Sequence, residues 1–170
     1  MLRRRSSRRV EWGLESVPRL LLCAALITSL SSCQREPEET PPLVKHVYHL
    51  NPYEKDFGYS QAVLIGKTLY ISGTVAADAQ GRLVAPGDMA GQMRAAYSNI
   101  QRTLSAHGVG FNAVVKEIIY TTDMDAFLKA ADLRFEYYDK EQMPATSWVQ
   151  VQRLIDPGFL VQIEAVVQLP

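Results

Sequence analysis

The segment at residues 159–168 constrains the fold of this chain more than any other part of the sequence. Every second side chain in it is apolar: Phe159, Val161, Ile163, Ala165 and Val167. Because successive side chains of a β-strand point to opposite sides of the sheet, this pattern predicts a strand with one fully apolar face. Such a face has to be covered, so we expect an α+β protein in which a mixed sheet carries two helices on one face.

The two helices and the remaining strands follow from apolar spacing and turn residues. One helix is expected to begin after Asp88, to carry an apolar stripe and to end at Gly108. A second helix is expected to open at Asp123 or Asp125, with four residues on one face: Phe127, Ala131, Phe135 and Tyr138. The other expected strands are 44–50, 62–65, 69–72, 114–122 and 145–152, with a tight hairpin around Gly66-Lys67.

The second face of the sheet has a mixed character. On the last strand it carries Leu160, Glu164 and Val166, together with two glutamines. The same alternation in the preceding strand assigns Trp148 to this second face as well. A surface that mixes large apolar and polar groups suits a subunit interface better than a surface open to water.

The N-terminus has the features of a bacterial secretion signal. Five arginines within the first nine residues precede an apolar run of eleven residues, Leu20–Leu30. A membrane-spanning helix needs about 20 apolar residues, so this run has the length of a signal peptide instead. It ends in Leu30-Ser31-Ser32-Cys33, which resembles the lipobox. We therefore expect a lipoprotein signal peptide at residues 1–32 and a lipid on Cys33, which anchors the protein to the membrane of the cell envelope on its periplasmic side.

The rest of the chain divides into a tether and one domain. Cys33 is followed by the polar, proline-rich stretch QREPEETPP, which lacks the apolar side chains needed to order itself. We expect residues 33–42 to be a flexible tether and residues 43–170 to form a single domain of ordinary size.

The composition of that domain argues against several partners. The chain has 18 basic and 18 acidic residues, and its first 33 residues hold six arginines and two glutamates, which leaves 12 basic and 16 acidic residues. Nucleic-acid binding requires a positive surface, so we expect no nucleic-acid partner. No cysteine follows Cys33, and the odd spacing of His46 and His49 places them on opposite faces of a strand. We therefore expect no metal site.

Four segments resemble the RidA/YjgF family of reactive-intermediate deaminases. They are Gly58-Tyr-Ser-Gln-Ala-Val63, Leu69-Tyr-Ile-Ser-Gly73, Pro144-Ala-Thr-Ser-Trp-Val-Gln-Val151 and Val161-Gln-Ile-Glu-Ala165. They occur in the family's order, and the resemblance spans residues 44 to 168. It implies a chorismate-mutase-like fold and a homotrimer with small-molecule sites in the clefts between subunits. It also implies hydrolysis of imines or enamines to ketoacids and ammonia, without metal or cofactor.

The resemblance transfers part of the family's site onto this chain. Glu164 matches the glutamate that helps to position or activate water, a role suited to a carboxylate. Tyr59 matches a tyrosine that lines the cleft, and Ser72 and Gly73 match the turn beside the bound ligand. The alternative for Glu164 is a purely structural glutamate at a subunit interface.

Three further positions of the site depart from the family. Thr146 stands where deaminating members carry an arginine that grips the substrate carboxylate in a two-pronged contact, which a threonine cannot make. Asp125 replaces a common asparagine, and Trp148 replaces a small residue. The changes predict a narrower cleft that is less favourable to anions.

Two functions therefore remain open at this point. The first is deaminase-like hydrolysis of a small imine, an enamine or a related metabolite, with Glu164 assisting water. The second is a non-catalytic trimer that binds a small ligand in its clefts or serves as a scaffold, since Thr146 replaces the substrate-binding arginine.

Overall fold

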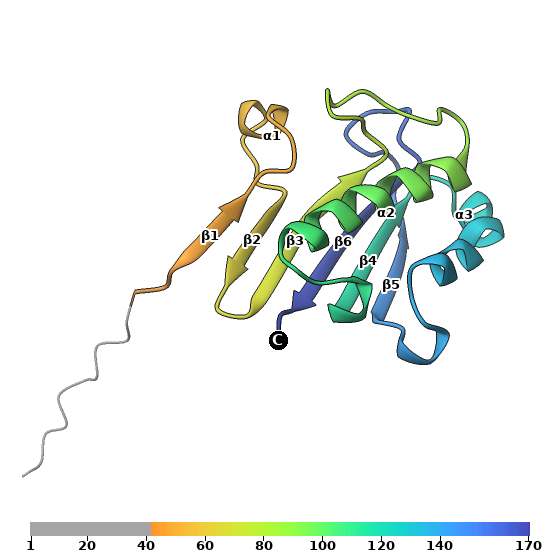
Figure 1. The fold of residues 1–170 in the computed structure, drawn as a ribbon. Helices are drawn as coiled ribbons and strands as arrows, with labels where there is room; N and C mark the ends of the chain where they lie inside the picture. Colours follow the sequence, from red (N-terminus) through yellow and green to blue (C-terminus); the bar gives the residue numbers. More distant parts are fainter. Residues whose placement is uncertain (1–41) are drawn as a thin grey trace, which may run out of the picture. The chain divides into compact units, whose positions relative to one another are not determined.

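The computed structural model describes residues 42–170 (Figure 1). The predicted signal peptide at 1–32, the predicted lipidation site Cys33 and all of the predicted tether except Pro42 lie outside the described residues. Among the described residues, no helix is both long and apolar enough to cross a membrane.

The described chain forms one six-stranded sheet in the order β1-β2-β3-β6-β4-β5. The strands are β1 (Lys45–Tyr48), β2 (Ala62–Ile65), β3 (Thr68–Val75), β4 (Val114–Thr121), β5 (Ala145–Gln150) and β6 (Val161–Gln168). β4 and β5 are parallel, and all other neighbours are antiparallel, so the mixed sheet that the sequence predicts is confirmed. β5 lies at one edge of the sheet and is therefore paired on one side only within the described chain.

Two helices, α2 (Met89–Ala106) and α3 (Met124–Ala130), lie over the same face of the sheet (Figure 1). Each begins at an aspartate that accepts a hydrogen bond from a backbone N–H of the first turn. Asp88 accepts from Gly91, and Asp123 accepts from Ala126. Asp123 rather than Asp125 is thus the cap of α3. A four-residue helix, α1 (Tyr53–Asp56), was not expected from the sequence.

The core lies between β6 and α2. Val161, Ile163 and Val167 are completely buried on the helix-covered face of β6, and Ala165 is nearly so. The stripe of α2 that packs above them is also completely buried: Met93, Tyr97, Ile100 and Leu104. The apolar alternation at 159–168 therefore predicted the covered face correctly.

The second predicted helix is shorter than expected. α3 ends at Ala130, and the chain continues as a 3-10 turn at Ala131–Glu136. Because a 3-10 turn has fewer residues per turn than an α-helix, the expected single face is broken. Phe127 and Tyr138 are buried, whereas Phe135 is 40% exposed.

The prediction that Trp148 shares a face with Glu164 is wrong. Trp148 pairs with Ile119 of β4, whose side chain is in the helix-covered core, and its ring contacts Phe127 of α3 edge-on at 5.1 Å. Glu164 pairs with Ile118 and lies on the opposite, open face. Alternation within a strand fixes which residues share a face, but it does not fix how two strands are aligned.

The open face remains apolar in part without Trp148. Val63, Tyr70, Ile118 and Val166 are among the apolar residues that line the pocket on it. Of these side chains, Tyr70 is the most exposed, at 49%.

Candidate functional site

Glu164 lies in a pocket on the open face of the sheet. The pocket has a volume of about 390 Å³ and is formed by β2, β3, β4 and β6. Its polar lining comes from Ser72, Lys116 and Glu164, and the main chain of Gly73 reaches it between these side chains. A carboxylate, an ammonium group and a hydroxyl thus line one concave, otherwise apolar surface, which is the usual composition of a small-molecule site.

Ser72 and Gly73 form an irregularity in β3 that shapes the pocket. The pairing of β3 with β6 shifts register between Ile71 and Thr74, so these two residues bulge from the ladder. The Ser72 hydroxyl donates to the carbonyl of Ser60 at 2.7 Å, and its backbone N–H donates to the carbonyl of Gln61. The bulge therefore fixes the loop that carries Tyr59.

Gly73 is required by close packing rather than by its backbone angles. A Cβ atom at this position would collide with the side chain of Gln162 on the neighbouring strand. The long side chain of Gln162 can cross the bulge because Gly73 leaves space for it.

Tyr59 borders the pocket but does not line it. With Gly73 and Gln61 it lines a smaller neighbouring cavity. Burial, together with nearby Tyr53 and Glu54, raises the pKa of the Tyr59 phenol well above its usual range. The phenol therefore stays protonated at neutral pH and can donate a hydrogen bond.

Asp125, Thr146 and Trp148 form a second group on the helix-covered side, around the edge strand β5. Asp125 is exposed in the first turn of α3, and the Trp148 side chain is 40% exposed. The Thr146 hydroxyl donates to the carbonyl of Pro144 and accepts from Arg134, both at 2.9 Å. The structure thus brings Ser72, Gly73 and Glu164 together, with Tyr59 beside them, and separates these four from the second group.

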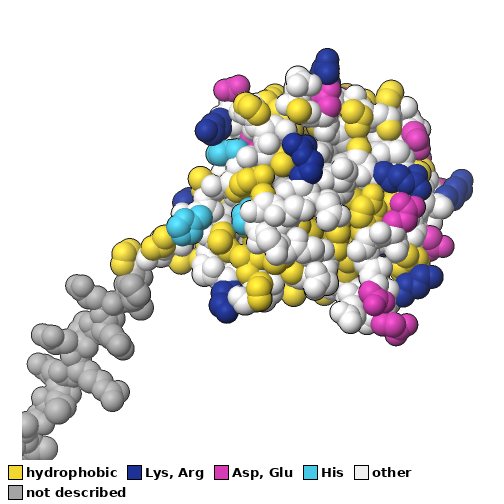
Figure 2. Space-filling model, in the orientation of Figure 1, with side chains coloured by type: hydrophobic (Ala, Val, Ile, Leu, Met, Phe, Trp, Pro, Cys, Tyr) yellow, Lys and Arg dark blue, Asp and Glu magenta, His cyan; other side chains and the backbone are white. Residues whose placement is uncertain are grey.

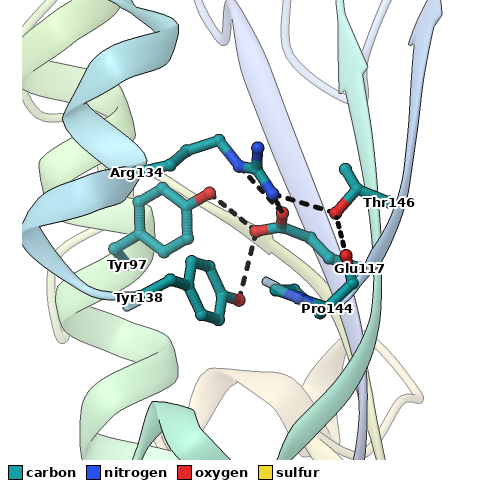
Figure 3. Close-up of polar contacts among 6 residues, drawn as sticks. All are labelled: Tyr97, Glu117, Arg134, Tyr138, Pro144 and Thr146. Atoms are coloured by element: carbon teal, nitrogen blue, oxygen red, sulfur yellow. Dashed lines mark hydrogen bonds and ion pairs between the residues drawn. The ribbon is translucent and has the colours of Figure 1, made fainter. Parts of the chain in front are cut away.

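A buried polar network lies behind Thr146, and it was not expected from the sequence. Its centre is Glu117 of β4, which is completely buried (Figure 3). One carboxylate oxygen accepts from the hydroxyls of Tyr97 at 2.6 Å and Tyr138 at 3.3 Å. The other accepts from Nε of Arg134 at 3.0 Å and from its Nη2 at 2.6 Å. Four donors therefore satisfy this carboxylate.

The charge states of the network follow from its surroundings. Burial and the charge of Glu117 raise the pKa of both tyrosines far above their usual range, so both remain donors. Burial lowers the pKa of Arg134, but the Glu117 carboxylate more than offsets this, and the pKa is raised overall. The one sequence signal for the network is Glu117 itself, an acidic residue two positions from Ile119 and therefore on the same, apolar face of the expected 114–122 strand.

The charges around these groups are dispersed. On the face seen in Figure 2, basic and acidic side chains are interspersed instead of forming one basic stripe. Within residues 42–170, no cluster of three or more histidine, cysteine, aspartate or glutamate side chains could hold a metal ion.

The chain matches one protein family over most of the described region. The model of the family described as Endoribonuclease L-PSP matches residues 53–169. The bovine 2-iminobutanoate/2-iminopropanoate deaminase is 39% identical over 109 residues, which is 64% of this chain and 77% of that protein. A RutC family protein of Pyrococcus horikoshii is 36% identical over 108 residues, which is 64% of this chain and 84% of that protein.

The fold agrees with these sequence matches. A Rid-family protein from Yersinia pestis superposes with a TM-score of 0.68 at 30% identity, over 74% of this chain and all of that one. The sheet order, the two helices on one face and the pocket around the β3 bulge thus define a RidA-type α+β protein. This chain belongs to the RidA/YjgF family.

Proposed function

We propose that this protein hydrolyses a small imine or enamine to a carbonyl compound and ammonia. The observation that carries the proposal is the position of the Glu164 carboxylate in a concave pocket beside the Ser72–Gly73 bulge and Lys116. The name of the bovine relative supports the class of reaction, because that protein is a deaminase of 2-iminobutanoate and 2-iminopropanoate.

In the proposed reaction, Glu164 acts as a general base toward water. The carboxylate accepts a proton as the water oxygen bonds to the imine carbon, and the C=N π-electrons move to nitrogen. The proton then passes to that nitrogen, which gives a carbinolamine. The carboxylate next takes the proton of the carbinolamine hydroxyl and passes it to nitrogen as the C–N bond breaks, so that ammonia leaves as the carbonyl forms. An enamine first becomes an imine by taking a proton at its β-carbon and losing one from nitrogen.

The same proposal includes a trimer with sites between subunits. Glu164, Ser72 and Gly73 face one side of the sheet, whereas Thr146 and Trp148 face the other. Side chains on opposite faces of a sheet cannot meet in one chain, so the two groups form one site only if a second copy brings its β5 edge to the pocket. The half-apolar open face, with Tyr70 half-exposed, suits such an interface.

The alternative is a trimer that binds its ligand without catalysis, and Thr146 is the observation that favours it. The residue takes the place of the arginine that grips the substrate carboxylate in deaminating members, and Arg134 and Pro144 already engage its hydroxyl. Loss of a charge-assisted contact worth about 1.5–3 kcal/mol should cost about 10- to 150-fold in transition-state binding.

The location of the protein is also a proposal. The arginine-rich start, the eleven-residue apolar run and the Ser32-Cys33 junction support export and lipidation. The domain would then act at the periplasmic side of the envelope membrane. The excess of acidic over basic residues after Cys33 gives no support to a ribonuclease activity.

The test is release of ammonia from freshly generated 2-iminobutanoate and from an uncharged imine of similar size. We expect the natural protein to act poorly on 2-iminobutanoate and better on the uncharged compound. Glu164→Gln should lower kcat/KM by about 100-fold or more, because it removes the base. Glu136→Gln, at an exposed surface pair, is the matched control and should leave kcat/KM unchanged.

The outcomes separate the two functions. Full activity of Glu164→Gln would remove Glu164 from catalysis. If the natural protein releases no ammonia from either imine, the non-catalytic alternative stands. If it acts on 2-iminobutanoate as fast as the bovine deaminase, the importance given to Thr146 is mistaken.

A further inference from the structure

An arginine does lie beside Thr146, although it comes from a different element. Nη2 of Arg134, in the 3-10 turn after α3, donates to the Thr146 hydroxyl at 2.9 Å. The centre of its guanidinium group is 5.4 Å from the ring centroid of Trp148. Arg134 therefore contacts two of the three residues at which this chain departs from the family's site.

One edge of the guanidinium group is fully engaged, and the other is not. Nε and Nη2 donate to Glu117, and Nη2 also donates to Thr146. Nη1 points away from Glu117 (Figure 3) and makes no hydrogen bond within residues 42–170. In this range, one side-chain nitrogen or oxygen is both fully buried and without a hydrogen-bond partner, and it is Nδ1 of His49. Because Nη1 of Arg134 also has no partner but is a different atom, it is not fully buried. The Arg134 side chain is 7% exposed, and its two unpaired N–H donors lie on this partly exposed edge near Trp148.

The charge behind these donors is already compensated. The Glu117 carboxylate contacts the guanidinium group directly and is itself completely buried, so water does not screen it. A ligand carboxylate at Nη1 would be attracted by the guanidinium group, but repulsion from the Glu117 carboxylate on the opposite edge of that group offsets part of the attraction while the ligand still loses its hydration. A neutral oxygen acceptor gains the hydrogen bond without this repulsion.

We propose that Arg134 is a specificity-determining residue of the cleft and that, through Nη1, it selects a ligand with an uncharged oxygen acceptor, such as an amide, an ester or a ketone, over a carboxylate. The inference rests on the proposed function for the location of the cleft. It deepens that function, because it assigns an uncharged imine as the substrate class. Thr146 positions the guanidinium group by accepting the hydrogen bond from Nη2.

The test uses Trp148 as a reporter within the site. The chain has two tryptophans, Trp12 and Trp148, so the full chain with Trp12→Phe carries a single one next to Arg134. Its fluorescence is titrated with pyruvamide and with pyruvate, which differ only in an amide and a carboxylate. We expect pyruvamide to bind about tenfold more tightly or better, since the repulsion from Glu117 acts on pyruvate alone.

The decisive variant is Glu117→Gln, which keeps the shape of the side chain and frees the charge of Arg134. It should shift the ratio of the two dissociation constants toward pyruvate by about tenfold or more, as expected when a neutral hydrogen bond becomes a charge-assisted one. Glu136→Gln removes the carboxylate of the exposed pair with Arg94 and should leave the ratio unchanged. A circular-dichroism spectrum of each variant confirms that it is folded.

Three results would overturn the inference. They are tighter binding of pyruvate than of pyruvamide by the natural protein, no response of Trp148 to pyruvamide, and an unchanged ratio in folded Glu117→Gln. If Glu117→Gln does not fold, the preference of the natural protein decides the matter alone. If the natural protein hydrolyses neither imine but still prefers pyruvamide to pyruvate, the proposed catalysis is refuted and the role of Arg134 is not.

Discussion

Replacing Arg134 by methionine should destabilise the protein severely. The side chain of Arg134 is 7% exposed and that of Glu117 is fully buried, and their closest nitrogen and oxygen atoms are 2.6 Å apart. The variant keeps the aliphatic volume of the arginine but leaves a buried carboxylate without its cation. Breaking one partner of such a pair costs about 3–5 kcal/mol. For a domain of this size, that loss corresponds to a fall in Tm of about 10–20 °C.

The double variant Arg134→Met/Glu117→Gln tests the reason for this loss. It contains no unpaired charge, and the glutamine carbonyl can still accept from Tyr97 and Tyr138. We therefore expect it to be more stable than Arg134→Met alone, by about 1–3 kcal/mol. Arg94→Met, at the exposed pair with Glu136, is the control and should change the unfolding free energy little.

The assay is urea unfolding followed by circular dichroism at one fixed protein concentration, because subunit association would make the stability depend on concentration. The reasoning is refuted if the double variant is no more stable than Arg134→Met. The same holds if Arg134→Met is as stable as the natural protein.

Further predictions concern the pocket, the surface, the assembly and the anchor. Gly73→Ala should unfold at lower urea concentration, and adding Gln162→Ala should restore stability by removing the colliding side chain; no restoration would contradict the packing argument. The hydrogen bond from Arg94 lowers the pKa of Glu136 against the opposing effect of burial. This carboxylate therefore stabilises the fold above its ordinary pKa of about 4.3 and loses that effect as the pH falls further, so Glu136→Gln should flatten the acid limb of a stability–pH curve. Light scattering at micromolar concentration should report a trimer, and a stable monomer would exclude the proposed clefts. Cys33→Ser should release the protein from the membrane fraction with a loss of lipid mass, and unchanged mass and location would end the lipoprotein proposal.

The local elements of the fold could be predicted well from the sequence. The apolar faces of β6 and α2 appear as periods of two and of 3.6 residues, and each period is a property of a single segment. The hairpin between β2 and β3 was expected from Gly66-Lys67, and the starts of α2 and α3 from aspartates that cap them. The end of α3 at Ala130 was not predicted, because the apolar residues from Phe127 to Tyr138 keep helical spacing through the 3-10 turn.

The candidate site was less predictable for the same reason. The residues of the pocket were identified through motifs that resemble a family, and the structure places Ser72, Gly73 and Glu164 around one cavity. The buried pair of Glu117 and Arg134 could not be identified in this way. The two residues are 17 positions apart in the chain, and neither belongs to a motif.

The sequence by itself determined which side chains share a face within each strand and helix. Only the tertiary structure decided which faces of different elements coincide. The parallel register of β4 and β5 aligns Glu117 with Thr146 and Ile119 with Trp148. Arg134, which pairs with Glu117, therefore also contacts Thr146, the residue that replaces the family's arginine. Alternation repeats every two residues along one strand, whereas register depends on hydrogen bonds and packing between strands that are distant in sequence.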